Sequence, residues 1–549
     1  MPSTPALPFL LLGCFLLAAC VQPPQAPRVR EPFWSWSRAS EKRIAHGLAR
    51  AALAWDAMAA RGRRTAQEER EYEDALASVL KTWASRQNPS QWQDGTEVRG
   101  NSSTHFILDL PPPSTPAEFS PQCLDRLMLA DEVRRPGDLN RAVQEGLGVP
   151  IVAQVLRPEN GLNGHGSLPP NGAYIALTAI VDFKPAPQGS PRHAVLRFFD
   201  PMRQSATRQS QPLPGKPLAA DYTAARVLAL DRKFLSGFSL AGLLYPEKVL
   251  ADSRLHLLDA YDPKRIPVVF VHGLMSDPHI WLHCVHAIAA DERLRRHYQP
   301  WYFLYPTGLA VPATASRLRE SLLEARQRLD PEGDDPGLRS TVLVGHSMGG
   351  LLSRLQAVDS GDAFWDAYFQ RPPEELLLSD ESRQELLKRL RFQRLPFVQR
   401  LVFITVPHRG SDLADKGLVM RLSKFIRLPV DTLLLASELM TGNFDALNPQ
   451  IRDWGAYAFL SLDTLSPRHP YLAAMNAQPL SVPHHSIIGR IGKNPLEQSS
   501  DGVVPYASAH LPTGTECVVP HWHGCVEKPD VVAEVARRLH QHLDALGRK

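Results

Sequence analysis

Residues 341–350 are Thr341-Val-Leu-Val-Gly-His-Ser-Met-Gly-Gly350, an apolar run that leads into a G-x-S-x-G motif. The run at 341–344 is typical of a buried parallel strand, and residues 351–355 continue at helical spacing. This pattern predicts a strand, a sharp turn at Ser347 and a helix. The flanking glycines permit the tight turn, which would expose the serine hydroxyl to a base. The backbone N–H of Met348 would then face a developing oxyanion.

A second buried strand is predicted upstream, at Ile266-Pro-Val-Val-Phe-Val-His-Gly-Leu274. The loop after such a strand can supply the second N–H group of an oxyanion hole. Leu274 would provide that group, and Gly273 would let the chain approach the substrate. The alternative is an ordinary junction between a strand and a loop, but the occurrence of Ser347 downstream favours the functional interpretation.

An acid and a base are expected after the serine, in the chain order Ser, Asp, His. Asp501 lies on a turn before an apolar run, where it would orient and stabilise an imidazolium, although a plain Asp-Gly turn is the alternative. Farther along, a predicted strand ends in a loop with His521 and His523, just before an amphipathic helix at 529–546. We expect His523 to be the base, and His521 remains the alternative.

Together these segments resemble the α/β-hydrolase superfamily, in particular its lipase and lipid-deacylase-like branch. The matching segments are 271–274, 345–350, 405–411, 500–505 and the loop at His523. They span about half of the chain, from residue 265 to the C-terminus. Two departures are Val406-Pro407, where the family usually has Thr-Pro, and the doubled histidine.

The resemblance implies an α/β-hydrolase fold, which is a mostly parallel sheet flanked by helices. It implies a catalytic triad of Ser347, Asp501 and His523, with Leu274 and Met348 as oxyanion donors and 405–411 as the floor of the site. It also implies a carboxylic ester or lipid-like substrate, an acyl-enzyme intermediate and no cofactor. An acyltransferase with the same triad and a non-catalytic envelope scaffold remain alternatives.

The N-terminus predicts export. Residues 7–19 are apolar but too short to span a bilayer, as in the core of a signal peptide at 1–19. The run ends in Leu17-Ala-Ala-Cys20, which resembles a bacterial lipobox with Cys20 as the lipidated residue. Val21 follows instead of Asp, so by analogy the anchor would lie in the outer membrane and the protein would face the periplasm. The run has no basic residue before it, and a secreted protein without lipid is the alternative.

The composition agrees with an exported globular enzyme, and the chain is long enough for two or more domains. The 549 residues include 61 basic and 57 acidic side chains, a balance of +4 that is too even to indicate a nucleic-acid partner. Six cysteines occur, and two of them (Cys14 and Cys20) fall in the export segment. The other four are Cys123, Cys284, Cys517 and Cys525.

The last two cysteines flank the histidine loop. A possible disulfide between Cys517 and Cys525 would hold the base in place in an oxidising compartment. The same two thiols could instead join His521 and His523 as zinc ligands, although their spacing does not match the usual zinc sites.

Four regions are expected around these motifs: a Pro-rich tether at 20–38, a helical hairpin region at 39–105, a β-rich accessory module at 122–262 and the catalytic domain at 263–549. The hairpin carries apolar residues at helical spacing and a possible capping box at Thr65. Two insertions, at 361–394 and 413–463, could form a lid over an acyl pocket. The helix expected at 432–440 is apolar nearly all round, which usually indicates burial.

Overall fold

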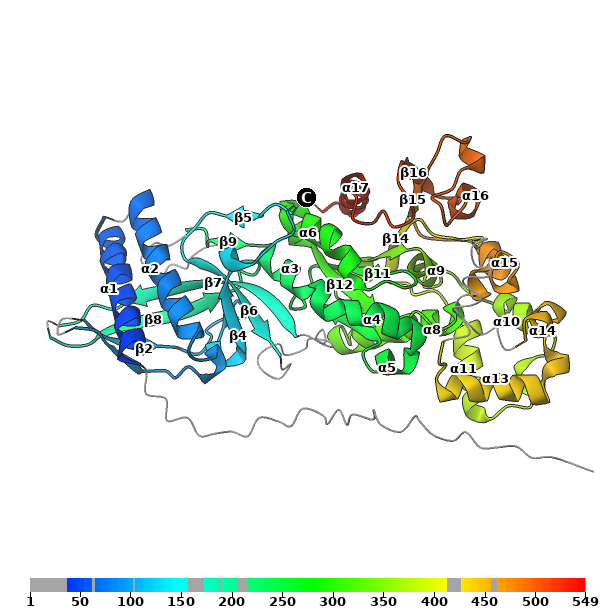
Figure 1. Ribbon diagram of the computed structural model, residues 1–549, viewed down its shortest axis with the longest axis horizontal. Helices are drawn as coiled ribbons and strands as arrows, with labels where there is room; N and C mark the ends of the chain where they lie inside the picture. The colour runs from blue at the N-terminus through cyan, green and yellow to red at the C-terminus, as the bar shows by residue number, and fades with distance from the viewer. Residues whose placement is uncertain are drawn as a thin grey trace, which may run out of the picture.

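The computed structural model describes residues 37–61, 65–101, 104–137, 139–156, 172–187, 189–204, 216–411, 426–455 and 463–548. The expected signal peptide, Cys20 and the tether up to residue 36 lie outside these residues, as do 412–425 and 456–462 within the second insertion. Two large sheets follow one another along the long axis of the molecule, with helices at both ends (Figure 1). None of the described helices is both long and apolar enough to cross a membrane.

The first body contains the helical hairpin and a mostly antiparallel sheet. Its elements are α1 (Arg38–Arg61), α2 (Ala66–Ala84), β1 (Thr96–Arg99), β2 (His105–Asp109), β3 (Glu118–Phe119), β4 (Arg126–Leu129), β6 (Val149–Val155), β7 (Ala173–Phe183) and β8 (Arg192–Phe199). The strand order is β1-β2-β8-β7-β6-β4, with β3 on β8, and only β2 and β8 pair in parallel. A separate pair, β5 (Val143–Gln144) and β9 (Ala220–Asp221), lies beside it.

The hairpin packs on this sheet, as Figure 1 shows. The predicted capping box at Thr65 is confirmed, since its hydroxyl accepts from the N–H of Glu68 and the Glu68 carboxylate accepts from the N–H of Thr65. The aromatic side chains of the hairpin lie in the core, where Trp55 stacks on Tyr72 with ring centroids 5.5 Å apart. The Tyr72 hydroxyl donates to the carbonyl of Val181 and accepts from its N–H, both at 2.9 Å.

The region expected to be a helical hairpin, 39–105, also contains strand. Residues 96–99 form β1, and residue 105 begins β2, because in both segments more buried side chains alternate with more exposed ones at period two. The two strands share one core with the hairpin, so the helices and the β-rich module form a single body.

The second body is built on a sheet of the strand order β10-β12-β11-β13-β14-β15-β16. These strands are β10 (Arg254–Leu257), β11 (Ile266–Val271), β12 (Tyr298–Leu304), β13 (Thr341–His346), β14 (Val398–Ile404), β15 (His484–Gly489) and β16 (Thr515–Val519). All neighbours are parallel except β10 and β12. The sheet therefore begins before residue 263, where the catalytic domain was expected to start.

Helices cover both faces of this sheet, because its strands are buried on both sides. In β11, Val268 and Phe270 face the core with α3 (Ala224–Ala229), α6 (Leu282–Ala290) and α17 (Pro529–Ala545). Val269 and Val271 face the opposite core with α8 (Val311–Leu329) and α9 (Met348–Arg354). This parallel, doubly covered sheet with its serine turn after β13 confirms the expected α/β-hydrolase fold.

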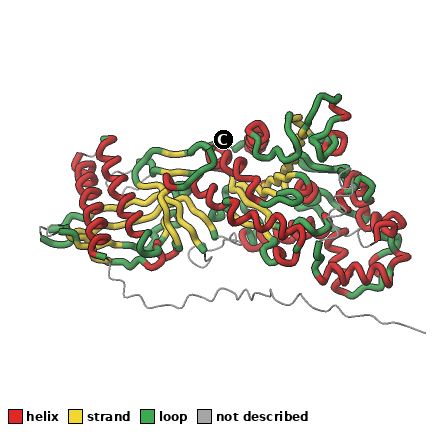
Figure 2. Tube along the Cα trace, in the orientation of Figure 1, coloured by secondary structure: helices red, strands yellow, loops and turns green. Residues whose placement is uncertain are grey.

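Both insertions contribute helices at the far end of the molecule. These are α10 (Ala363–Tyr368), α11 (Asp380–Leu390), α13 (Val430–Gly442) and α14 (Pro449–Trp454), and α15 (Pro470–Ala477) follows the second insertion. Figure 2 shows this end as helices and loops.

The expected burial of the 432–440 helix is wrong in part. Leu435 and Leu439 are buried, but Leu433 and Leu434 are exposed, because α13 lies on the surface with one side against the core. The remaining described α-helices are α4 (Arg232–Leu244), α5 (Pro246–Leu250), α7 (Glu292–His297) and α16 (Tyr506–Ala509).

Candidate active site

Ser347 occupies the turn between β13 and α9, with φ 51° and ψ −126°. A non-glycine residue rarely adopts this backbone conformation, and such strain is typical of a nucleophile held on a tight turn. The glycines around it are required by close packing. A Cβ atom on Gly349 would lie 2.2 Å from the carbonyl oxygen of Val271, and one on Gly350 would lie 2.0 Å from Cγ2 of Val406.

The structure brings Ser347, His523 and Asp501 into one line of hydrogen bonds. Nε2 of His523 lies 2.9 Å from Oγ of Ser347, and Nδ1 lies 2.9 Å from Oδ2 of Asp501. Oδ1 of Asp501 accepts from the backbone N–H groups of Val503 (2.8 Å) and Val504 (2.6 Å). The buried carboxylate is therefore fixed by its own turn and orients the imidazole.

The other histidine of the loop has a different partner. Nε2 of His521 lies 2.8 and 2.9 Å from the two carboxylate oxygens of Asp530, in the first turn of α17. Of the two candidate bases, the structure thus places His523 against the serine and pairs His521 with an acid at the edge of the site.

The loop after β11 passes directly over the serine. A Cβ atom on Gly273 would lie 2.9 Å from Nδ1 of His346 and 3.0 Å from Cβ of Ser347, so a larger residue here would force its neighbours to shift. Leu274 follows at once, and Met348 is the first residue of α9. The two backbone N–H groups expected to form the oxyanion hole therefore flank the nucleophile from neighbouring strands.

The segment 405–411 connects the serine turn to the turn that carries Asp501. The N–H of Ser347 donates to the carbonyl of Ile404 at 3.0 Å, and the hydroxyl of Ser411 donates to the carbonyl of Val503. Val406, which replaces the usual Thr of the family motif, packs its methyl groups on Gly350. The segment thus contacts both the serine turn and the turn that carries Asp501.

Two further histidines beside the nucleophile are buried. Burial lowers the pKa of His272 to about 4, and burial together with the neighbouring His523 lowers the pKa of His346 to about 3. No motif assigned a role to His346 or to Thr405, yet both donate to the main-chain carbonyl of His523. The available signal was their position, since each lies at the end of a central strand.

The cysteines near the base do not form the expected bridge. Cys517 and Cys525 are both free thiols in the structure. Cys525 packs in the core with Cys284, where burial and the nearby Asp501 raise its pKa to about 12. The histidine loop is held by hydrogen bonds to Asp501 instead.

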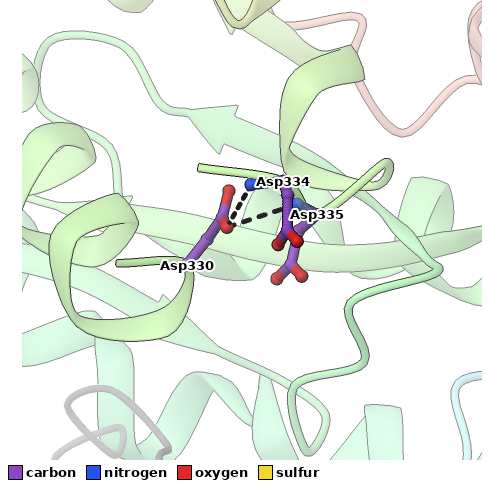
Figure 3. A group of neighbouring side chains, drawn as sticks. All are labelled: Asp330, Asp334 and Asp335. Carbon is purple, nitrogen blue, oxygen red and sulfur yellow. Dashed lines mark hydrogen bonds between the residues drawn. The ribbon is translucent and has the colours of Figure 1, made fainter. Parts of the chain in front are cut away.

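The zinc alternative is also not supported, because the ligand atoms of Cys517, His521, His523 and Cys525, all of which the structure describes, do not come together in a group that could hold a metal ion. Within the described parts of the chain, the one side-chain group that could hold a metal ion is Asp330, Asp334 and Asp335, shown in Figure 3. This group lies in the loop after α8, where Oδ1 of Asp330 accepts from the N–H groups of Asp334 and Asp335. That arrangement is a local turn.

Comparison with known proteins finds only distant likenesses. No family model and no curated protein matches the chain. Among solved structures, the lipase BlEst2 of Bacillus licheniformis in its mature form is 18% identical, with a TM-score of 0.31, over 52% of this chain and 98% of that chain. EstA from Clostridium botulinum is 14% identical, with a TM-score of 0.32, over 50% and 87% of the two chains. The enol-lactonase from Burkholderia xenovorans LB400 is 14% identical, with a TM-score of 0.27, over 52% and 96%. Likeness at this level carries no argument about activity, and the fold assignment rests on the strand order and the serine turn.

Proposed function

We propose that the protein is a serine hydrolase that cleaves carboxylic esters through an acyl-enzyme. The observation that carries this proposal is the hydrogen-bonded line from Asp501 through His523 to Ser347, on a strained turn between a strand and a helix. A scaffold protein has no need for such an arrangement, whereas nucleophilic catalysis requires it.

Each residue of the line has a role in the reaction. Ser347 attacks the ester carbonyl while His523 accepts its proton and then returns the proton to the departing alcohol. Asp501 fixes the imidazole tautomer and stabilises the imidazolium. The N–H groups of Leu274 and Met348 stabilise the oxyanion. Water, activated by the same histidine, then releases the acid. These steps use only side chains and backbone of the protein.

The helical insertions favour a lipid-like or bulky acyl group. A cavity of about 180 Å³ lies between α8, α11 and α13. A smaller apolar cavity, lined by Tyr368, Leu386 and Leu390, shares Leu309 and Ala313 with it. The smaller cavity is mainly apolar, which suits an acyl chain better than a small polar ester, whereas the larger one also carries charged side chains such as Arg317, Glu385 and Asp431. Neither cavity is lined by Ser347 or His523, so the preference for a long acyl chain is part of the proposal that the ester series tests.

Hydrolysis of p-nitrophenyl esters from acetate to palmitate tests the proposal. We expect release of p-nitrophenol and free acid by the wild-type protein, with a preference for the longer chains, and no release by Ser347→Ala. Free acid as product identifies water as the acceptor, whereas transfer to added alcohol would indicate an acyltransferase. A folded wild-type protein that hydrolyses no ester, with or without detergent, would overturn the proposal.

We also propose that the enzyme acts at the cell envelope, anchored in the outer membrane through a lipid on Cys20. The support is the sequence Leu17-Ala-Ala-Cys20 after an apolar run. Metabolic labelling with an alkyne analogue of palmitate should mark the wild-type protein and not Cys20→Ser. An unlabelled wild-type protein that is nevertheless exported would contradict the anchor.

A further inference from the structure

Both the carbonyl and the N–H group of the His523 main chain form hydrogen bonds. Its carbonyl oxygen accepts from Nε2–H of His346 at 3.1 Å and from Oγ1–H of Thr405 at 3.2 Å. Its N–H donates to the carbonyl of Asp501 at 3.0 Å. The triad contacts fix the ring of His523, and these three bonds fix the backbone that carries the ring.

Both donors to the carbonyl come from the rigid centre of the sheet. His346 ends β13 and pairs in register with Ile404, the last residue of β14, and Thr405 follows it. The N–H of Thr405 donates to the carbonyl of Ile487 in β15 at 2.9 Å. The loop of the base is thus bonded to the same strand ends that hold the nucleophile.

Thr405 has a strained backbone, with φ 48°. A β-branched residue rarely adopts the left-handed region, and such strain persists only where the surroundings enforce it. Glycine would fit this backbone better but has no hydroxyl. The Thr405 hydroxyl thus donates a hydrogen bond that glycine could not make, from a backbone conformation that is strained for threonine.

His346 can donate only as the tautomer with its proton on Nε2. Its ring centroid lies 5.1 Å from that of His523. A neutral His346 beside the base donates its hydrogen bond without repelling the imidazolium that forms during the reaction.

We propose that Thr405 and His346 are positioning residues, which set the direction of the His523 imidazole through its main-chain carbonyl. This inference rests on the proposed hydrolase function. Loss of one donor would let the loop shift, and small misplacements of a catalytic group reduce rates steeply.

Thr405→Val tests the proposal, because it removes the hydroxyl and keeps the shape of the side chain. We expect kcat to fall about tenfold with KM unchanged, and Thr405→Ser to recover most of the rate. The matched control is Thr178→Val in β7, a strand of the other sheet. The buried hydroxyl of Thr178 donates to the carbonyl of Ala219 at 2.6 Å. This control should lower Tm and leave kcat as it is.

Thr405→Gly separates positioning from stability. It removes the hydroxyl but relieves the strain at φ 48°, so we expect Tm at or above that of the wild type together with a reduced kcat. If Thr405 only supported the fold, kcat would instead follow Tm across the Val, Ser and Gly variants, and the proposal would be wrong.

The rate of labelling by a fluorophosphonate distinguishes the two proposals. Wild-type labelling at Ser347 with slower labelling of Thr405→Val supports both. Equal labelling of the two proteins, or a kcat of Thr405→Val within about twofold of the wild type, overturns the positioning role alone. No labelling of the folded wild type overturns the hydrolase function, and the positioning role with it.

Discussion

Nε2 of His523 lies 2.9 Å from Oγ of Ser347, although 176 positions separate the two residues in the chain. The contact forms because Ser347 follows β13 and His523 follows β16, and the carboxyl ends of parallel strands meet at one edge of a sheet. The loop after β16 reaches back past β15 and β14 to the nucleophile. This geometry leads to the following predictions.

Ser347 carries strain that glycine would not. Ser347→Gly and Ser347→Ala should both be inactive, but Ser347→Gly should be more stable by about 1 kcal/mol or more, because φ is 51° at this position. Denaturant unfolding of the two variants measures the difference. Equal stability of the Ala and Gly variants would show that the turn is not strained in solution.

Asp501→Asn should lower kcat by a factor of about 10² to 10⁴ and change Tm little. The amide can still accept from Val503 and Val504, but its NH₂ group would favour the wrong imidazole tautomer. Asp530→Asn, the same change beside His521, is the control and should retain kcat within about twofold. Equal losses in the two variants would argue against the assigned acid.

The two histidines of the loop should differ sharply in their effect on the rate. His523→Ala removes the group that contacts Ser347, so ester hydrolysis should fall to a residual rate. His521→Ala breaks a pair with Asp530 at the edge of the site and should cost much less. Steady-state kinetics decides, and the reverse order would move the base to His521.

Gly350→Ala should destabilise the protein by about 1–3 kcal/mol, because the new Cβ would lie 2.0 Å from Cγ2 of Val406. Val406→Ala makes room for it. In thermal unfolding, the double variant should therefore be more stable than the sum of the two single changes predicts. Strict additivity would show that the two residues do not touch.

Acid should destabilise the hydrolase body. Burial lowers the pKa of His346 and His485 to about 3 and that of His272 and His542 to about 4, from an ordinary value of 6.5. Below pH 6.5 the unfolded chain binds protons that the folded chain does not, so the free energy of unfolding falls as pH falls towards these values.

Each histidine contributes up to about 2 kcal/mol of this loss between pH 6.5 and 5. Tm at pH 5 should therefore lie below Tm at pH 7.5. His542→Gln, which keeps a polar partner for the hydroxyl of Tyr298, should reduce the slope. A Tm that stays constant or rises as the pH falls would contradict the buried neutral state.

The core of the site could be predicted because its signals are local. Ten consecutive residues, 341–350, contain the strand, the serine turn and the start of the helix, and Asp501 precedes a glycine in a turn sequence. Both residues could therefore be predicted from the local pattern. The choice between His521 and His523 could not be made from the sequence, because nothing in it showed that Asp530 would pair with His521.

Other features depended on contacts that no local pattern reports. Thr405 and His346 reach His523 across 118 and 177 positions. The strands β1 and β2 are only four and five residues long and follow a strong helical pattern, so they were missed. The two cysteines that flank the loop are close in sequence, but nothing there showed that Cys525 would be buried in the core of the sheet.

The most direct test of the account is to treat the purified protein with a fluorophosphonate and to locate the modified residue by mass spectrometry. The account predicts one modification, on Oγ of Ser347, that is lost when His523 is replaced by alanine. A folded protein that stays unmodified even in detergent, or that is modified at another residue, would contradict it.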